Sequence, residues 1–423
     1  MNISIIGTGY VGLVSGACFA SLGHRVICVD VDKEKVDKIN NSVSPIYEKG
    51  LTDLLEQHKT RIQATTSYEE AIKESEITFI CVGTPSKDDG DIDLSYIDQA
   101  AVSIAQELKK KKMFHSVVVK STVVPGTTQN HVLPILEKES GKKAGIDFGV
   151  GMNPEFLREG VAVDDFLHPD RVVNGYYDER TKKTLTELYN VFSCPKVYTS
   201  LTAAEMIKYA SNSFLATKIS FINELGNLCK NLGVDTYEVA EGMGLDKRIE
   251  RAFLNAGIGW GGSCFPKDVS ALIALGEKRK IPCNVMKSAV SVNEKQPLFL
   301  IDILKRHVPV LNGKTICVLG LAFKPDTDDI RDTRAEPIVK ALLDAKAKIK
   351  TYDPKAMGNF KKIYPNLMYC KTAKEAIKDA DAVLLTTEWD EFKTLDFSGK
   401  LVIDGRHMLS AKVTAEVYDG VCW

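Results

Sequence analysis

No Cys-x-x-Cys pair occurs in the sequence, although it contains ten cysteines. Structural zinc sites typically use such close spacing, so a structural zinc site is not predicted and we expect no metal site. Cys28, Cys81 and Cys317 instead lie inside apolar runs, which is typical of a thiol that serves as a small core residue. Scattered thiols favour a reducing compartment, and the sequence therefore predicts a cytoplasmic protein.

The sequence also lacks an excess of either charge, because 55 lysines and arginines nearly balance 56 aspartates and glutamates. This balance argues against a nucleic acid or a membrane surface as the main partner. The first charged residue is Arg25, but glycines interrupt the apolar stretch before it at positions 7, 9, 12 and 16. Their spacing favours a strand, a turn and a helix over a signal peptide or a membrane anchor.

Strand-length apolar runs alternate with helical segments through the first half of the chain. The predicted strands are Ile3–Ile6, Arg25–Val29, Ile77–Val82, Val117–Lys120 and Phe148–Met152. Such alternation predicts an α/β fold with a parallel, doubly wound sheet. The last third repeats the order more loosely, with predicted strands at Lys314–Leu319, Lys348–Tyr352, Ala382–Leu385 and Leu401–Ile403 and a helix at Ala335–Ala345.

The middle of the chain lacks this alternation. Apolar residues at helical spacing predict one helix over Leu201–Leu232, which suits a spine between domains or a dimer interface, or equally an ordinary core helix. The predicted architecture is two Rossmann-like, doubly wound domains joined by a central helical domain. Its boundaries are 1–198 for a dinucleotide-binding domain, 199–300 for the helical domain and 301–423 for the second Rossmann-like domain.

A dinucleotide-binding fingerprint, Gly-x-Gly-x-x-Gly, stands at Gly7, Gly9 and Gly12, directly after the first predicted strand. The first glycine makes a tight turn, the second admits the pyrophosphate and the third lets helix and strand pack closely. Asp30 ends the next strand, where a carboxylate binds the ribose and disfavours a 2′-phosphate. The motif predicts an NAD site, with a flavin site or a vestigial fold as alternatives. The second Rossmann-like domain lacks the fingerprint, so we expect it to bind something else.

Two loops with threonines follow predicted strands, Thr84 in Val-Gly-Thr-Pro and Thr122 in Lys-Ser-Thr-Val. Because loops at the carboxyl ends of parallel strands line the ligand crevice, we expect both hydroxyls to face the cofactor. The alternative for either residue alone is an ordinary turn threonine.

The segment Gly-Gly-Ser-Cys-Phe-Pro-Lys-Asp at 261–268 places one cysteine, Cys264, at a flexible turn before a predicted helix. A thiol near a helix N-terminus and beside Lys267 is typically more nucleophilic. Asp268, one turn further on, is a candidate acid–base or water-orienting group, or else a first-turn carboxylate stabilised by the helix dipole. A cysteine nucleophile together with a hydride acceptor predicts oxidation past the aldehyde to an acid, through a thioester.

Three further features are candidates for the same site. Lys208 and Asn212 are one turn apart on the long helix and suit an oxyanion, although a lysine there is also typical of a solvated surface. Glu155 follows a strand and is a candidate general base or water-positioning group. The glycine-rich segment 253–261 suits a phosphate, or alternatively a mobile linker.

These motifs together resemble the UDP-glucose/GDP-mannose dehydrogenase family, and within it the bacterial UDP-glucose 6-dehydrogenases. The resemblance covers essentially the whole chain. It rests on GTGYVGL at 7–13, VGTP at 82–85, KSTV at 120–123, NPEFLREG at 153–160, AEMIKYASN at 204–212, FLNAGIGWGGSCFPKD at 253–268 and GLAFKPDTDDIR at 320–331. Several ordered motifs with a cysteine nucleophile are far more specific than the glycine fingerprint alone.

The resemblance implies roles for these residues. Cys264 would capture the aldehyde as a thiohemiacetal and then carry the thioester, while Lys208 and Asn212 would steady the C6 oxygen. Asp268 would hold the lysine and a water, and Thr122 and Glu155 would order that water. The implied cofactor contacts are Gly7, Gly9, Tyr10, Val11, Gly12, Asp30, Lys35, Thr84, Thr122, Lys267 and Arg331. The implied substrate contacts are Glu155, Phe156, Leu157, Glu159, Lys208, Asn212, Arg248, Phe253, Leu254, Asn255, Ala256, Gly257, Gly261, Lys324 and Arg406.

The leading functional hypothesis is NAD-dependent, four-electron oxidation of UDP-glucose to UDP-glucuronate by a homodimer, in which Arg248 would come from the neighbouring subunit. One alternative is the same chemistry on GDP-mannose or a UDP-N-acetylhexosamine, although residues 158–171 resemble the UDP-glucose branch. A two-electron hydroxyacid dehydrogenase would not need Cys264. A non-catalytic protein that binds NAD and a nucleotide sugar would not need the complete set of Cys264, Lys208, Asn212 and Asp268.

Overall fold

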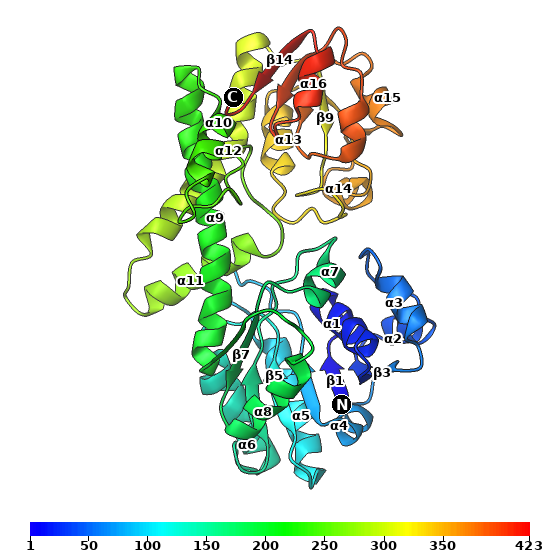
Figure 1. Cartoon of the computed structure of the whole chain (residues 1–423). Helices are drawn as coiled ribbons and strands as arrows, with labels where there is room; N and C mark the ends of the chain where they lie inside the picture. The colour runs from blue at the N-terminus through cyan, green and yellow to red at the C-terminus, as the bar shows by residue number, and fades with distance from the viewer. The chain divides into compact units, whose positions relative to one another are not determined.

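The computed structural model describes residues 1–423, and the chain divides into two compact units, Met1–Ser211 and Asn212–Trp423. Each unit is built on one β-sheet with helices packed against it (Figure 1). The boundary between the units falls inside helix α9 (Leu201–Leu232), which has the bounds that its apolar spacing predicts. None of the helices is long and apolar enough to cross a membrane.

The first unit holds an eight-stranded sheet in the order β3-β2-β1-β4-β5-β6-β7-β8. Its strands are β1 (Asn2–Ile6), β2 (Arg25–Val29), β3 (Ile62–Thr65), β4 (Ile77–Ile80), β5 (Ser116–Val119), β6 (Gly149–Met152), β7 (Val172–Tyr176) and β8 (Lys196–Thr199). Neighbours from β3 through β6 are parallel, whereas β6 and β7 are antiparallel. This one pair departs from the predicted parallel arrangement. The connection between these two strands contains one six-residue helix, α7 (Ala162–Leu167).

Alternate side chains of the strands enter two separate apolar cores, one on each face of this sheet. Ile3, Ile5 and Val118 pack in the core under α1 (Tyr10–Ser21), α2 (Lys33–Asn40), α3 (Leu51–Gln57), α7 and α8 (Glu179–Tyr189). Ile6, Val117 and Val119 pack in the other core under α4 (Tyr68–Glu74), α5 (Ser95–Lys110) and α6 (Leu133–Ser140), which follows the short turn η1 (Thr128–Val132). Helices on both faces are the mark of a doubly wound sheet.

The second unit holds a six-stranded, wholly parallel sheet in the order β11-β10-β9-β12-β13-β14. Its strands are β9 (Thr315–Leu319), β10 (Lys348–Tyr352), β11 (Met368–Tyr369), β12 (Ala382–Leu385), β13 (Leu401–Asp404) and β14 (Val417–Gly420). Its helices are the rest of α9, α10 (Thr236–Gly244), α11 (Phe265–Lys278), α12 (Asn284–His307), α13 (Ala335–Asp344), α14 (Met357–Ile363), α15 (Ala373–Ile377), η2 (Asp390–Thr394) and α16 (Leu409–Thr414).

Numbered by chain order within each sheet, both sheets begin 3-2-1-4-5-6, which is the Rossmann order. The prediction of two Rossmann-like domains with a helical region between them is therefore confirmed. In each sheet the strand order reverses beside the first strand, so loops at the carboxyl ends of neighbouring strands gather at one place.

A buried carboxylate, Asp353, ties three of these loops together in the second unit. It follows β10 and is fully buried. Its oxygens accept hydrogen bonds from backbone N–H groups of Leu321 and Ala322 after β9, from those of Lys355 and Ala356, and from the indole of Trp389 after β12. Charge-assisted bonds of this kind are among the strongest that fix a loop.

We predict that Asp353→Ala destabilises the second unit by at least about 3 kcal/mol, because it leaves several buried N–H donors without an acceptor. The midpoint of thermal unfolding should then fall by roughly 6–12 °C. Asp344→Ala, at an exposed position on α13, is the matched control and should shift the midpoint little. Equal midpoints for the two variants would show that Asp353 does not stabilise the loops.

Candidate active site

The glycine fingerprint forms an open backbone cradle at the start of α1. Gly7 has a φ of +95°, which the tight turn requires and which an L side chain rarely adopts. A Cβ atom on Gly12 would lie 1.9 Å from the Gly7 carbonyl oxygen, whereas one on Gly9 would meet no protein atom within 4 Å. The helix begins at Tyr10, inside the fingerprint. The free N–H groups of its first turn therefore face the gap beside Gly9, where a pyrophosphate fits.

Asp30 lies at the end of β2 and binds the same turn. One oxygen accepts hydrogen bonds from Thr8 N–H at 2.8 Å and Thr8 Oγ1 at 2.5 Å, and the other accepts from Asp32 N–H at 3.0 Å. Burial opposes ionisation, but these bonds and the nearby Lys35 hold the pKa of Asp30 below its usual range. The residue is only partly buried, so a negative carboxylate remains in reach of a ribose.

The two threonine loops contact one another. The Thr84 hydroxyl donates to the Thr122 carbonyl oxygen at 2.9 Å, and the Ser121 hydroxyl donates to the Val82 carbonyl oxygen at 2.7 Å. Both loops follow neighbouring strands, β4 and β5, as the sequence predicts. The structure therefore brings Thr84 and Thr122 together at the carboxyl end of this sheet.

Glu155 and Lys208 form a buried ion pair in the first unit. Lys208 Nζ lies 3.0 Å from Glu155 Oε1, and the other Glu155 oxygen accepts from Leu157 N–H at 2.6 Å. The side chains of the pair are only 5% and 6% exposed. Burial opposes ionisation of Glu155, but Lys208, the Leu157 N–H and Lys120 hold its pKa below the usual range. Lys208 is thus not a solvated surface lysine.

Lys120 is a buried cation that the sequence reasoning did not single out. Its ammonium donates to Asn153 Oδ1 at 2.7 Å, which also accepts from Tyr189 OH at 2.6 Å. Burial lowers the pKa of Lys120 to about 8, with Lys208 acting in the same direction. A lysine directly after an apolar strand is the signal that marks it. Glu155 therefore has two buried ammonium groups as neighbours.

The ring of Phe156 contacts two cations, Arg171 and Lys208, and Lys208 also forms the ion pair with Glu155. The Arg171 guanidinium stacks at 3.8 Å from its ring centroid, and Lys208 Nζ lies 5.5 Å from the same centroid. Cation–π contacts at these distances fix the ring, and with it the start of the 155–160 segment.

Cys264 is the exposed thiol of the second unit. It caps the N-terminus of α11, which begins at Phe265 with Pro266 in its first turn, as the sequence predicts. By contrast Cys28, Cys81 and Cys317 are buried, and burial raises the pKa of Cys28 and of Cys81 to about 12. The exposed position at a helix N-terminus suits Cys264 for nucleophilic chemistry.

Asp268 lies one turn further along α11 and is 1% exposed. It accepts a hydrogen bond from Asn212 Nδ2 at 2.6 Å, and Lys267 Nζ donates to its other oxygen at 2.8 Å. Its backbone N–H donates to the Cys264 carbonyl oxygen at 2.9 Å. The structure therefore joins Cys264, Asp268, Asn212 and Lys267 in one group.

The glycine-rich segment before Cys264 passes through gaps that admit only backbone. Added Cβ atoms would lie 2.6 Å from the Gly405 carbonyl oxygen at Gly257, 2.4 Å from Asn293 Oδ1 at Gly259 and 2.1 Å from the Asp332 carbonyl oxygen at Gly261. Distances this short exclude any side chain. The segment is thus a fixed part of the fold and not a mobile linker.

A ladder of buried amides on α9 and α12 holds this segment, and the sequence reasoning missed it. Gly257 N–H donates to Asn223 Oδ1, and Gln296 Nε2 donates to the Gly257 carbonyl oxygen, both at 2.8 Å. Asn293 bonds both backbone groups of Trp260, at 2.7 and 2.9 Å. These amides stand at helical spacing among apolar residues, which is the signal for buried polar partners.

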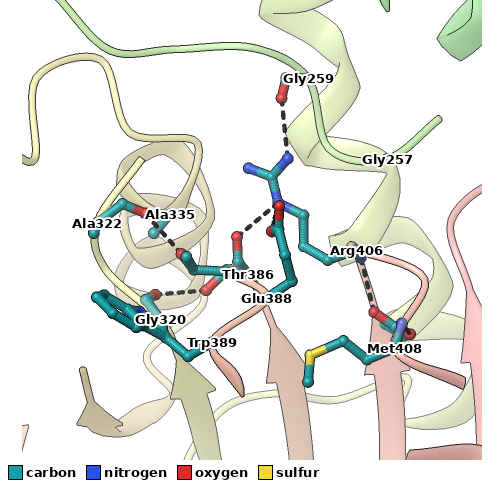
Figure 2. A network of polar contacts seen from close by, with 12 residues as sticks. Gly257, Gly259, Gly320, Ala322, Ala335, Thr386, Glu388, Trp389, Arg406 and Met408 are labelled. Carbon is teal, nitrogen blue, oxygen red and sulfur yellow. Dashed lines mark hydrogen bonds and ion pairs between the residues drawn. The ribbon is translucent and has the colours of Figure 1, made fainter. Parts of the chain in front are cut away.

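Arg406 reaches across the segment from the end of β13 (Figure 2). Its Nε donates to the Thr386 carbonyl oxygen at 2.9 Å and lies 3.4 Å from Glu388 Oε2, while Nη1 donates to the Gly259 carbonyl oxygen at 3.4 Å. Arg334, another missed residue, lies beside Gly259 and Gly261 and bonds the Asp332 carbonyl oxygen. Two guanidinium groups therefore lie next to the segment, an arrangement that suits a diphosphate.

The remaining candidates are distributed as follows. Arg331 lies beside the cysteine segment, because its carbonyl oxygen accepts from Gly262 N–H at 3.0 Å, and its side chain pairs with Asp329. Lys324 follows Phe323, whose ring packs against Gly262. Arg248 stands on an exposed turn and pairs only with Asp246, so a single chain does not bring it to the other candidates.

A dinucleotide cradle and an exposed thiol at a helix terminus define a class of enzyme, the dehydrogenases that also use a cysteine nucleophile. Three domain models of the UDP-glucose/GDP-mannose dehydrogenase family match the chain: its NAD binding domain over residues 1–193, its central domain over 202–295 and its UDP binding domain over 317–411. The chain belongs to this family, as its motifs predict.

Individual relatives span nearly the whole chain. The UDP-glucose 6-dehydrogenase AglM of Haloferax volcanii is 47% identical over 97% of this chain and 98% of its own length. The UDP-glucose 6-dehydrogenase YwqF of Bacillus subtilis is 43% identical over 96% of this chain and 93% of its own length. The structure of a UDP-glucose dehydrogenase from the archaeon Pyrobaculum islandicum matches with a TM-score of 0.96 and 42% identity, covering 100% of this chain and 98% of that one.

The cradle can be tested with two alanine substitutions. Gly12→Ala should destabilise the first unit by at least about 2 kcal/mol, because its Cβ atom meets the Gly7 carbonyl oxygen. Gly9→Ala should leave stability within about 0.5 kcal/mol, because its Cβ atom enters open space. The methyl group of Gly9→Ala should nevertheless weaken NADH binding at least about tenfold, which is a loss of about 1.4 kcal/mol in binding free energy. Thermal unfolding and calorimetry measure the two effects, and unchanged NADH affinity in Gly9→Ala would contradict the assignment.

Proposed function

We propose that this chain oxidises UDP-glucose to UDP-glucuronate, with two NAD reduced for each sugar. The observation that carries the proposal is the exposed thiol of Cys264 at the N-terminus of α11. It is grouped with Asp268, Asn212 and Lys267, in a chain whose N-terminal Rossmann domain has an NAD-binding cradle. A dehydrogenase that stops after one oxidation has no need of a nucleophile.

The first unit supplies the cofactor site and part of the acid–base machinery. Bound NAD supplies the chemistry of hydride acceptance in both oxidations. Gly7, Gly9 and Gly12 would hold its pyrophosphate and Asp30 its ribose, with Tyr10, Val11, Lys35, Thr84 and Thr122 as further contacts. Lys208, held as an ammonium by its ion pair with Glu155, would stabilise the negative charge that develops on the C6 oxygen as the hydroxyl proton leaves to water.

The second unit supplies the covalent step. Cys264 Sγ would add to the C6 aldehyde to form a thiohemiacetal, from which loss of a second hydride and a proton leaves a thioester. Asn212 would donate to the C6 oxygen, and Asp268, fixed by Asn212 and Lys267, would accept a proton from the water that attacks. Attack of water breaks the S–C6 bond, and the products are the sugar carboxylate and the free thiol. Thr122 and Glu155 would position that water.

Recognition of the nucleotide sugar would fall mainly to the segment before Cys264. Its backbone groups, with Phe253 to Gly257 and Gly261, would bind the nucleotide sugar next to Arg406 and Arg334. Lys324 adds positive charge, and the family calls the last domain UDP binding. Lys267 and Arg331 would contact the cofactor. Phe156, Leu157 and Glu159 would contact the sugar.

We assign residues 1–198 to NAD binding, residues 199–300 to catalysis and dimerisation, and residues 301–423 to UDP binding.

We further propose a homodimer formed through α9. Within the second unit its exposed apolar residues are Phe214, Phe221, Leu228 and Leu232, of which the first three are seven residues apart and share one face. Phe214 is 65% exposed, Phe221 51% and Leu228 55%. A continuous apolar stripe on a long helix matches the self-complementary face of a twofold dimer. In that dimer Arg248 would reach the partner's substrate. We place the protein in the cytoplasm, which suits ten cysteines that form no disulfide.

The proposed reaction predicts a stoichiometry. With NAD, UDP-glucose should yield two NADH per sugar, and NADP should serve poorly because of Asp30.

Cys264→Ser should lose at least about 10³-fold in kcat, since serine is the poorer nucleophile and its ester hydrolyses more slowly, while UDP-glucose still binds. Cys283→Ser is the matched control, because that thiol caps α12 but has no catalytic neighbours.

Three outcomes would contradict the proposal. One NADH per sugar would indicate a two-electron dehydrogenase. Faster turnover of GDP-mannose or a UDP-N-acetylhexosamine would change the substrate. Near-normal turnover in Cys264→Ser, or after selective alkylation of that thiol, would exclude the covalent route.

The dimer can be tested separately. Phe221→Lys places a charge in the middle of the stripe, and we expect the variant to sediment as a monomer at micromolar concentration, because burying an unpaired ammonium costs several kcal/mol. Val413→Lys is the control, since Val413 is also an exposed apolar residue, at 83%, but lies on α16. A dimer that persists in Phe221→Lys would place the interface elsewhere.

A further inference from the structure

Glu48 is a buried carboxylate with no role in the reaction described above. It lies in the loop between α2 and α3 and is 6% exposed. Carboxylates are rarely buried to this degree unless other groups of the protein satisfy both oxygens. The partners of Glu48 therefore indicate what it holds in place.

Those partners come from two segments that are far apart in the sequence. One Glu48 oxygen accepts hydrogen bonds from the Tyr10 hydroxyl and from Gly160 N–H, the latter at 2.7 Å. The other oxygen accepts from Ala162 N–H at 2.8 Å. Gly160 N–H also approaches the Tyr10 hydroxyl oxygen, at 2.9 Å. A single carboxylate thus joins the first residue of α1 to the loop at 160–162.

Both segments belong to the site. Tyr10 directly follows Gly9 in the dinucleotide cradle. The loop at 160–162 continues the segment that begins with Glu155, which is held by Leu157 N–H and by Lys208. Arg158, which lies between Glu155 and Gly160 in the sequence, is anchored by a hydrogen bond of 2.6 Å from its Nη2 to Asp165 Oδ1. The path from cradle to ion pair therefore consists of short hydrogen bonds and a few residues of anchored backbone.

The chemistry of the Tyr10 contact favours a stable link. Burial, the hydrogen bond to Glu48 and its charge raise the pKa of Tyr10 far above its usual range, so the phenol stays a donor at every physiological pH. Hydrogen bonds to a charged carboxylate are shorter and stronger than bonds between neutral groups. A displacement of the Tyr10 hydroxyl therefore displaces Glu48 and Gly160 as well.

We propose that Glu48 is a positioning residue that couples occupancy of the dinucleotide cradle to the arrangement of the 155–162 segment and its Glu155–Lys208 pair. Binding of the dinucleotide at Gly9 fixes Tyr10, Glu48 passes that constraint to Gly160 and Ala162, and the segment that meets the nucleotide sugar is ordered in turn. The consequence for the sugar rests on the proposed function, whereas the consequence for the segment rests only on dinucleotide binding.

The test compares wild type with Glu48→Gln and Tyr10→Phe. In Glu48→Gln an amide N–H₂ group must face a backbone N–H donor, so one of the two loop contacts is lost. In Tyr10→Phe the ring stays but its donor is gone. Glu34→Gln is the matched control, because that glutamate lies in the same unit with a 76% exposed side chain and pairs only with Lys38.

The first measurement is the affinity for UDP-glucose by calorimetry, with and without saturating NADH. We expect NADH to raise this affinity at least about fivefold in wild type and Glu34→Gln, and less than about twofold in Glu48→Gln and Tyr10→Phe. A purely structural role would lower the thermal midpoint but leave this ratio unchanged. A wild-type ratio of one, or a full ratio in folded Glu48→Gln, overturns the proposal. If Glu48→Gln does not fold, Tyr10→Phe decides on the same criterion.

The second measurement is independent of the sugar. Hydrogen exchange of residues 155–162 should slow when NADH is added to wild type, and should not slow in the two variants. Equal NADH-dependent protection in all proteins overturns the coupling. Protection in wild type together with no binding of UDP-glucose would instead overturn the proposed function and leave the coupling intact.

Discussion

The segment that leads to Cys264 runs through gaps with no room for a Cβ atom, and the place of the thiol depends on this close backbone packing. At Gly257, Gly259 and Gly261 an added methyl group would lie within 2.6 Å of a neighbouring oxygen. The backbone can approach so closely only because the amides of α9 and α12 take up its N–H and carbonyl groups. The rigid segment in turn sets where α11 begins, and hence where an exposed cysteine stands at a helix N-terminus.

Local patterns in the sequence were sufficient for much of the fold. The bounds of β2, β10, β12 and α9 agree with the predicted ones. In β2, β12 and α9 the apolar residues follow the spacing of the element, which is the signal that marks it in the sequence. Edge strands such as β8 and β11 were missed, since they are short and only partly buried and so carry no strong apolar signal.

The candidate site was predictable where one short motif carries its own geometry, as at Gly7–Gly12 and around Cys264. It was not predictable where a contact joins distant segments. Glu48, Arg334 and the pairing of Lys120 with Asn153 depend on where the chain returns in space, which periodicity does not record. The role of Lys208 is an intermediate case, because its helix was evident but its burial beside Glu155 was not.

The two Rossmann sheets show how one strand order serves two purposes. Asp30 keeps a partly exposed carboxylate at the end of β2, whereas Asp353, at the same place after β10, is fully buried and binds the protein's own N–H groups. The second carboxylate is therefore unavailable to a ribose, which agrees with the missing glycine fingerprint and with a domain that binds a different ligand.

Because α9 and α12 both bond the same glycine-rich segment, the amide ladder also fixes how these two helices are aligned. Apolar side chains alone would let two long helices slide by a turn at modest cost, because one leucine contact resembles the next. Asn223, Asn293 and Gln296 find their partners at a single offset, and a slide would leave each of them buried without one. Replacing the three by leucines would therefore preserve a helical pair while removing what makes its alignment unique.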